Sequence, residues 1–273
     1  MKCLAIETAT DTCSVALMLG DQCLELCEVL PRRQTERVLP MVEQLLMQAG
    51  VTLSQLDVIA FSQGPGAFTG VRVAVSVAQG LAFSADLPTV GISTLACTAQ
   101  AAADKFGAGH WLVGQDARMG EVYLGGYASV SGERIVQPVI ADMLCAPEGV
   151  PSLPDISSNE ASASTEHTEH AQTWRGVGSA DLYIKTFRQL WPQLGEWHSS
   201  TLNAAASAGA GLHGSIGLDG EDVEQEAVAR LCGPHAAAIM PLAQQAWLRG
   251  DAVAAELARP VYLRNQVVQG AIR

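Results

Sequence analysis

Basic residues are scarce in this chain, and no stretch of the sequence concentrates them. The 273 residues include 16 lysines and arginines against 28 aspartates and glutamates, which gives a formal net charge of −12. The summed field of such a chain repels a phosphate backbone unless cations gather locally. The composition therefore argues against a protein that holds nucleic acid over a large surface of its own.

Patterned cysteines and long apolar runs are also missing. The seven cysteines are scattered, and no two are spaced as C-x-x-C, which argues against a disulfide framework and a zinc site. Glu7 interrupts the N-terminal apolar run too early for a signal peptide, and we expect no stretch that approaches the ~18 apolar residues of a membrane span. These absences predict a cytoplasmic protein without a membrane segment.

Hydrophobic residues make up 48% of the chain, enough for one large or two modest domains. Three short apolar runs with polar breaks, at 3–8, 13–19 and 23–29, predict an antiparallel meander. Helical spacing then predicts a helix with Thr35 as its N-cap and a stop at Gly50. Within it, Pro40 is tolerable only near the first turn.

A buried strand over 58–62, a helix from Gly70 to Ala85 and a strand over 89–92 are expected next. The order strand, strand, strand, helix, strand, helix is that of a ribonuclease H-like half. Strands over 110–116 and 121–127, joined by a turn, indicate the start of a second, related half.

Two segments, 151–173 and 199–222, are rich in Ser, Ala, Gly, Thr and acidic residues, and we expect them to be mobile insertions. A last helix stopping near Gly250 and an extended tail over 260–265 follow. The sequence thus predicts one domain over 1–107, joined by 235–273, and a second, degenerate domain over 108–234.

The helix expected from Gly70 to Ala85 is apolar on nearly every side. Small residues recur every fourth position from Gly70, and only Arg72, Ser76 and Gln79 form a polar line. Such a helix is either central within its own chain or part of a subunit interface. The apolar band of the preceding helix, wider than one sheet contact requires, favours a two-helix interface. The interface residues predicted on this basis are Arg37, Met41, Arg72, Val75, Ser76 and Gln79.

Four segments together resemble the signature of the TsaB/YeaZ family. They are 5–11 (AIETATD), 64–72 (GPGAFTGVR), 116–123 (DARMGEVY) and 262–264 (YLR). The resemblance is continuous over roughly 1–128 and patchy beyond. It implies an α/β fold of two ribonuclease H-like halves, as in actin, sugar kinases and heat-shock chaperones (the ASKHA fold), with the second half degenerate.

The same resemblance implies a function in the modification of tRNA. A TsaB-type protein is a non-catalytic dimerisation subunit that pairs through its N-terminal helices with the catalytic subunit TsaD. TsaD transfers threonylcarbamoyl to adenosine 37 of tRNAs that read codons beginning with A. TsaC-type proteins make the adenylate that supplies this group, TsaE is an ATPase that joins the complex, and tRNA is contacted mainly through TsaD. A homodimer through the same surface is also plausible for an exposed apolar helix pair.

The resemblance also indicates what this chain has lost. TsaD carries two metal-binding histidines, four residues apart, where this sequence has Thr94 and Thr98. Hydroxyls are poor ligands for a transition metal, and the third ligand of TsaD falls near Pro234 here. We therefore expect no metal site, no catalytic residue and no bound cofactor, with ATP and metal belonging to the partner subunits.

Polar residues in two turns are candidate contacts with a nucleotide or a partner. They are Asp11, Asp116, Arg118 and Glu121, for which a capped turn and a salt-bridged hairpin are the structural alternatives. Two other functions stay open at this point. One is a metal-dependent glycoprotease-like peptidase, which needs metal ligands, and the other is a stand-alone actin-like ATPase, which needs phosphate-binding glycine motifs.

Overall fold

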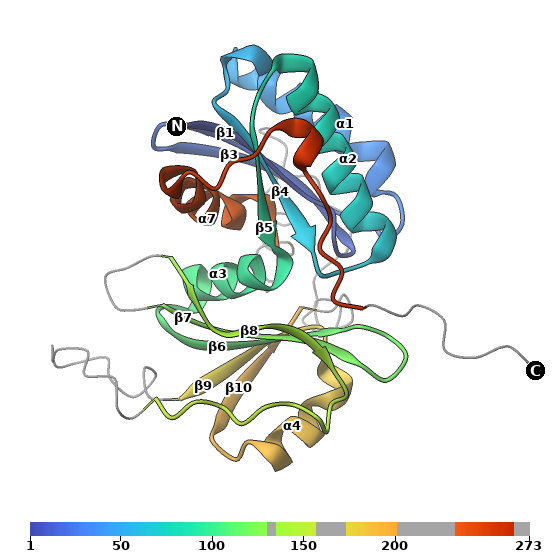
Figure 1. The fold of residues 1–273 in the computed structure, drawn as a ribbon, viewed down its shortest axis with the longest axis vertical. Coiled ribbons are helices and arrows are strands. Elements are labelled where there is room, and N and C mark those ends of the chain that lie inside the picture. The colour runs from blue at the N-terminus through green and yellow to red at the C-terminus, as the bar shows by residue number, and fades with distance from the viewer. Residues whose placement is uncertain (130–134, 157–172, 201–232, 265–273) are drawn as a thin grey trace, which may run out of the picture.

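The computed structural model describes residues 1–129, 135–156, 173–200 and 233–264, and the molecule is built in layers (Figure 1). Two helices lie on one side of a first sheet, two more helices lie between this sheet and a second one, and a short helix covers the far side of the second sheet. The chain is thus a mixed α/β protein with two sheets.

The first sheet contains the five strands expected from the N-terminal third of the sequence, and their existence is confirmed. They are β1 (Lys2–Glu7), β2 (Thr12–Leu19), β3 (Gln22–Val29), β4 (Val58–Gly64) and β5 (Thr89–Ser93). Their order is β3-β2-β1-β4-β5, with an antiparallel meander β1 to β3 and parallel pairing of β1, β4 and β5.

The second sheet repeats this topology. Its strands are β6 (Gly109–Asp116), β7 (Val122–Ser129), β8 (Gln137–Cys145), β9 (Trp174–Gly178) and β10 (Leu194–Ser199). Read from β8 to β10, the order is again third, second, first, fourth, fifth, with the same parallel and antiparallel pairs. The second sheet, of which the sequence predicted only β6 and β7, thus has the same strand order as the first.

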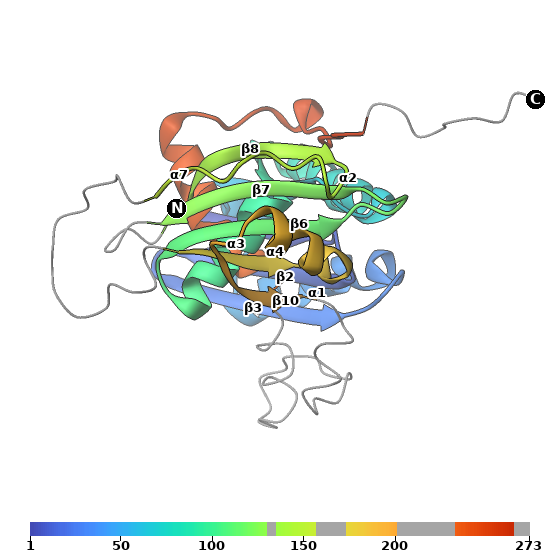
Figure 2. The same ribbon diagram turned by 90° about the horizontal axis from the view of Figure 1, so that it is seen from below.

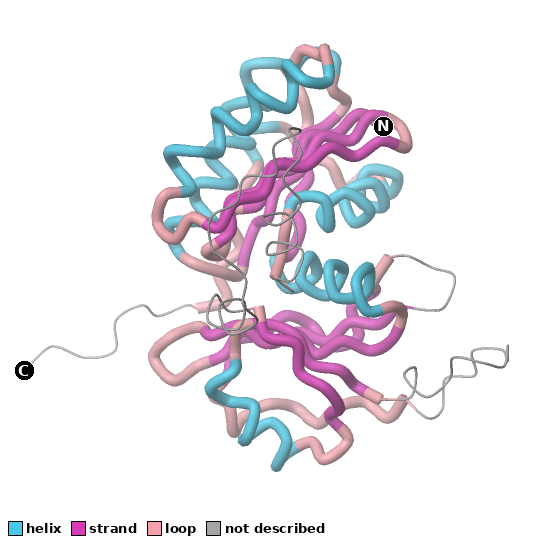
Figure 3. The backbone as a smooth tube through the Cα atoms, turned by 180° about the vertical axis from the view of Figure 1, so that it is seen from behind, coloured by secondary structure: helices cyan, strands magenta, loops and turns pink. Residues whose placement is uncertain are grey.

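The helices take up distinct positions around the sheets (Figure 3). Helices α1 (Gln34–Ala49) and α2 (Phe68–Ala85) cover one face of the first sheet, and α7 (Ala236–Arg249) covers the other. Helix α3 (Thr94–Phe106) lies between α7 and the second sheet. Helix α4 (Ile184–Leu190) lies over the outer side of the second sheet (Figure 2). Short 3-10 helices are η1 (Leu53–Gln55), η3 (Asp181–Tyr183) and η4 (Ala255–Leu257).

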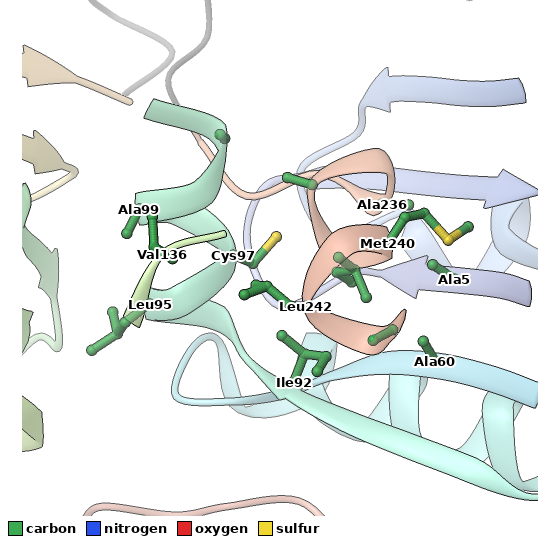
Figure 4. Close-up of a cluster of buried hydrophobic side chains, with 14 of the residues drawn as sticks. Ala5, Ala60, Ile92, Leu95, Cys97, Ala99, Val136, Ala236, Met240 and Leu242 are labelled. Carbon is green, nitrogen blue, oxygen red and sulfur yellow. The ribbon is translucent and has the colours of Figure 1, made fainter. Parts of the chain in front are cut away.

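A continuous apolar core joins the two sheets through α3 and α7. Ile92, Met240 and Leu242 are buried there near the alanines of β1 and β4, and Leu95 is buried on the side of α3 that faces the second sheet (Figure 4). Burying such a side chain stabilises the fold by about 1.5–3 kcal/mol. This core holds the two sheets in a fixed relation along one side of the molecule.

Several boundaries differ from the expectations. Thr35 is not an N-cap, because α1 begins at Gln34 with Arg33 at the cap position, and Pro40 lies in the second turn. Gly50 does end α1, in the left-handed conformation that glycine favours. Helix α2 begins at Phe68, ahead of Gly70. The proposed insertions 151–173 and 199–222 lie largely outside the described residues, as does the end of the 260–265 tail.

Candidate functional site

The small residues of α2 face the first sheet. Gly70, Ala74, Ala78 and Ala82 are all buried. A Cβ atom on Gly70 would lie 2.0 Å from the carbonyl oxygen of Thr8, while the Thr8 hydroxyl donates to the Gly70 carbonyl at 2.8 Å. The stripe therefore serves close packing of α2 on its own sheet.

The opposite side of α2 is open. Ser76, Gly80 and Phe83 are exposed, and Phe83 keeps 76% of its surface accessible. Leu39 and Met47 on the neighbouring α1 are exposed as well. We call these exposed parts of α1 and α2 the outer face. Helix α2 thus packs on its own sheet, as the first interpretation expects, and the subunit interface of the second interpretation stays a prediction.

Helix α2 also requires a correction to the expectation about membrane spans. It has 18 residues with a mean hydropathy of 1.2, so by length and composition alone it is sufficient to cross a membrane. One such helix is weak evidence, because a core helix passes the same test. Here its small-residue side packs on the first sheet.

Two of the predicted interface residues are wrongly placed. Met41 is 0% exposed and Val75 is 5% exposed, and both pack in the core beneath α1 and α2. Neither side chain reaches a partner in this conformation. Arg72 and Ser76 are exposed and Gln79 is partly exposed, whereas Arg37 is held at the edge by an ion pair with Glu28. Residue periodicity defines the faces of a helix but does not say which face meets the sheet.

A cleft of about 1460 Å³ opens between the ends of the two sheets. The β1–β2 turn and the start of α2 line one wall, and the β6–β7 turn lines the other. Asp11, Asp116 and Arg118 all line this cleft, so the structure brings three of the four candidate contact residues around one cavity.

The β6–β7 turn is a salt-bridged hairpin. An oxygen of Asp116 accepts from the backbone N–H of Arg118 at 2.9 Å, and its other oxygen pairs with the Arg118 guanidinium at 3.1 Å. Arg118 and Met119 both adopt positive φ values, which cost about 1 kcal/mol or more each for residues with a side chain. The fourth candidate, Glu121, does not line the cleft but pairs with Arg264. These contacts fix the turn, and a role in ligand contact stays a prediction.

A segment whose role the sequence did not indicate crosses this cleft. Residues 261–264, which we call the strap, follow η4 and line the cavity. Arg72 donates its Nε–H to the Tyr262 hydroxyl at 2.7 Å and lies over the Phe68 ring at 3.7 Å. The guanidinium of Arg264 donates to the carbonyl of Ala117 at 3.1 Å. Tyr262 and Arg264 belong to a segment recognised by resemblance, but only the folded chain shows what they touch.

Thr94 and Thr98, which the resemblance aligns with the metal ligands of TsaD, are packed inside the fold. Both are buried in the first turns of α3. The Thr98 hydroxyl donates to the Thr94 carbonyl at 2.8 Å and accepts from Gln115 at 3.2 Å. In the part of the chain that the structure describes, no group of three or more His, Cys, Asp or Glu side chains is placed to hold a metal ion.

One acidic residue is fully buried close to the same helices. Glu7 at the end of β1 accepts from the Ala9 N–H at 2.6 Å, and its other carboxyl oxygen has no hydrogen-bond partner among the described residues. Burial raises the pKa of Glu7 to about 7, against the lowering effects of Ser62, Ala9 and His235. Burial lowers the pKa of His235, but the hydrogen bond and charge of Glu25 outweigh it and raise this pKa above its ordinary value.

Comparisons with known proteins agree with this architecture. The family model described as "TsaD: tRNA N6-adenosine threonylcarbamoyltransferase" matches residues 27–267. The tRNA threonylcarbamoyladenosine biosynthesis protein TsaB of Escherichia coli K12 is 36% identical over 267 residues, covering 98% of this chain and 96% of that protein. The tRNA N6-adenosine threonylcarbamoyltransferase of Methylobacillus flagellatus is 46% identical over 68 residues, 25% of this chain and 20% of that enzyme.

Solved structures show the same relation. A structure of YeaZ from Pseudomonas aeruginosa has a TM-score of 0.72 at 35% identity, covering 96% of this chain and 99% of that one. Another structure from Pseudomonas aeruginosa, described as similar to peptidase YeaZ, has a TM-score of 0.74 at 36% identity, with the same coverage. With sequence similarity along nearly its whole length and the same fold, this chain belongs to the TsaB/YeaZ family.

Proposed function

We propose that this chain is a non-catalytic subunit that docks on TsaD through the outer face of α1 and α2 and supports N6-threonylcarbamoylation of adenosine 37 of tRNA. The observation that carries the proposal is the exposure of large apolar side chains, including Phe83 and Met47, on two adjacent helices. Large apolar side chains exposed on adjacent helices are typical of a site of protein association.

The kind of partner follows from the relation between the two families. The TsaD family model matches this chain from residue 27 to 267, so a TsaD-type protein is expected to carry an equivalent helix pair on an equivalent sheet. Two such pairs pack ridges into grooves about a pseudo-two-fold axis, as in a symmetric dimer. The open small residues Ser76 and Gly80 on α2 would let a partner helix approach closely.

A supporting function rather than catalysis fits the chemistry of the residues present. Thr94 and Thr98 offer neutral hydroxyls, of which Thr98 is engaged by Thr94 and Gln115. A peptidase would need a metal-activated water, and a stand-alone ATPase would need the phosphate-binding glycine pattern absent from the sequence. Neither alternative is favoured by a specific contact among the described residues.

The fold assignment and the setting complete the proposal. We infer that the two sheets are the halves of an ASKHA fold, with residues 1–107 and 235–273 in one domain and 108–234 in the other, because the strand order repeats. We place the protein in the cytoplasm, where TsaE and a TsaC-type synthase are the further members of the tRNA-modifying machinery. With a net charge of −12, the chain would leave most tRNA contact to TsaD.

Light scattering of the chain mixed with its cognate TsaD tests the docking surface. We expect a heterodimer for the unmodified chain and its loss in Phe83→Arg, because a buried unpaired charge opposes association. Leu248→Arg is the matched control, since Leu248 is 78% exposed but lies on α7, on the other side of the first sheet. Equal binding by both variants would contradict the proposed surface.

A further inference from the structure

The strap joins the two sides of the molecule at the end remote from the shared core. Figure 1 shows the C-terminal segment after η4 running beside α2 toward the second sheet. At its start, Val261 donates its N–H to the carbonyl of Gln63 on β4 at 2.7 Å. The strap is therefore attached to the first sheet before it crosses the cleft.

The middle of the strap is held by the first turns of α2. The Arg72 guanidinium lies 3.7 Å from the Phe68 ring centre and 5.7 Å from that of Tyr262, and it donates to the Tyr262 hydroxyl. The rings of Phe68 and Tyr262 lie 5.9 Å apart. Phe68, Arg72 and Tyr262 are all exposed, so this stack continues the outer face along α2.

The end of the strap binds the β6–β7 turn through Arg264. Arg264 donates to the carbonyls of Ala117 and Arg118 at 3.1 and 3.3 Å and pairs with the Glu121 carboxylate. Since Arg118 is in the left-handed conformation, the strap supplies donors to a turn whose backbone has an unfavourable geometry. The strap, which contacts α2 through Tyr262, therefore helps to hold the hairpin on the opposite wall of the cleft.

We propose that the strap couples partner docking on α2 to the β6–β7 hairpin and hence to the cleft between the two sheets. The coupling rests on the proposed function for the identity of the partner, and on the strap contacts for its path. Only one residue separates Tyr262 from Arg264, and each residue spans at most about 3.5 Å. A partner that fixes Arg72 and Tyr262 thus restricts Arg264, and through it the hairpin.

Two backbone amides of the hairpin report on this coupling. The N–H of Ala117 donates to the Glu121 carbonyl at 3.0 Å, and the N–H of Glu121 donates to the Arg118 carbonyl at 3.2 Å. In the isolated chain, Arg72→Ala and Tyr262→Phe are expected to speed hydrogen exchange at both amides about fivefold, the effect of one lost hydrogen bond. Arg249→Ala, which removes an exposed arginine of α7 paired with Asp251, is the matched control and should leave both rates unchanged.

Addition of TsaD completes the test. TsaD is expected to slow hydrogen exchange at the Ala117 and Glu121 amides of the unmodified chain. It is expected to bind the Arg264→Ala variant as well, but without slowing exchange at these two amides. Three results would each overturn the coupling: unchanged rates in Arg72→Ala and Tyr262→Phe, an equal effect of Arg249→Ala, or bound TsaD that leaves the exchange of both amides unaffected. If the unmodified chain does not bind TsaD, the proposed function is overturned instead. The exchange rates of the isolated chain test the strap contacts without TsaD, so they distinguish a failure of the coupling from a failure of the proposed function.

Discussion

Replacement of Glu7 by glutamine should change the dependence of stability on pH. The Glu7 carboxyl is fully buried, and burial raises its pKa from an ordinary 4.5 to about 7. Between these values the folded chain holds a proton that the unfolded chain releases. Stability is therefore expected to fall as the pH rises through this window and to level off above about pH 7.

The size of the effect follows from the same two values. Each tenfold change in proton affinity is worth about 1.4 kcal/mol, so the rise from 4.5 to about 7 corresponds to about 3 kcal/mol. Glu7→Gln keeps the shape but cannot ionise. Relative to the unmodified chain, the variant should gain about 3 kcal/mol between about pH 5 and about pH 8.

The groups near Glu7 determine how the experiment is read. His235 at the start of α7 lowers the pKa of Glu7 by its charge, and His235 itself pairs with Glu25 of β3. Three buried thiols also interact with the Glu7 charge, Cys13 on β2, Cys27 on β3 and Cys97 on α3. The pKa of Cys97 is raised well above its usual range by burial, so this thiol stays neutral. The pKa of His235 is also raised, so its contribution to stability is likewise lost as the pH rises, but this group is present in both proteins.

Urea unfolding followed by circular dichroism across this pH range is the assay. Glu36→Gln is the control, since Glu36 is an exposed carboxylate paired with Arg33 and should leave the slope unchanged. If Glu7→Gln shows the same dependence on pH as the unmodified chain, the argument from a buried, protonated carboxyl is refuted.

Three further predictions follow from contacts elsewhere. Gly70→Ala should lower the free energy of unfolding by about 3 kcal/mol, because the added Cβ would meet the Thr8 carbonyl. Gly80→Ala should raise the free energy of unfolding by about 0.5–1 kcal/mol, because the space around Gly80 is open. Equal urea midpoints for the two variants would contradict this difference. Arg175→Met should lower the free energy of unfolding by about 2–4 kcal/mol, measured by thermal unfolding, because Arg175 donates to the carbonyl of the last residue of α3 and to those of the next two residues; an unchanged stability would refute that role. Metal analysis of the purified chain should find no stoichiometric zinc or iron, and one ion per chain would revive the peptidase alternative.

The first sheet was predictable because its strands are short apolar runs between polar breaks. The turn between β2 and β3, for example, lies at Gly20 and Asp21. Helix α3 was not predicted as a helix, because nine of its thirteen residues are buried and it lacks the polar face that reveals a surface helix. Strands β9 and β10 contain only one β-branched residue between them, Val177, and were missed for that reason.

The candidate site was predictable only in part. Sequence periodicity identified α2 as an unusually apolar helix, but the positions of Met41 and Val75 depend on which side the sheet covers. The strap has no periodicity, and Tyr262 meets Arg72 across 190 positions of sequence. Contacts of this length arise from the tertiary fold and leave no local pattern.

The central claim is that this chain acts through TsaD and not by itself. Reconstituted threonylcarbamoylation of tRNA, measured with TsaD and the other components present and with this chain added or withheld, tests it most directly. The account predicts modified tRNA only when TsaD and this chain are both present, and loss of product in Phe83→Arg but not in Leu248→Arg. Modified tRNA formed by this chain without TsaD, or full activity of TsaD without this chain, would contradict the account.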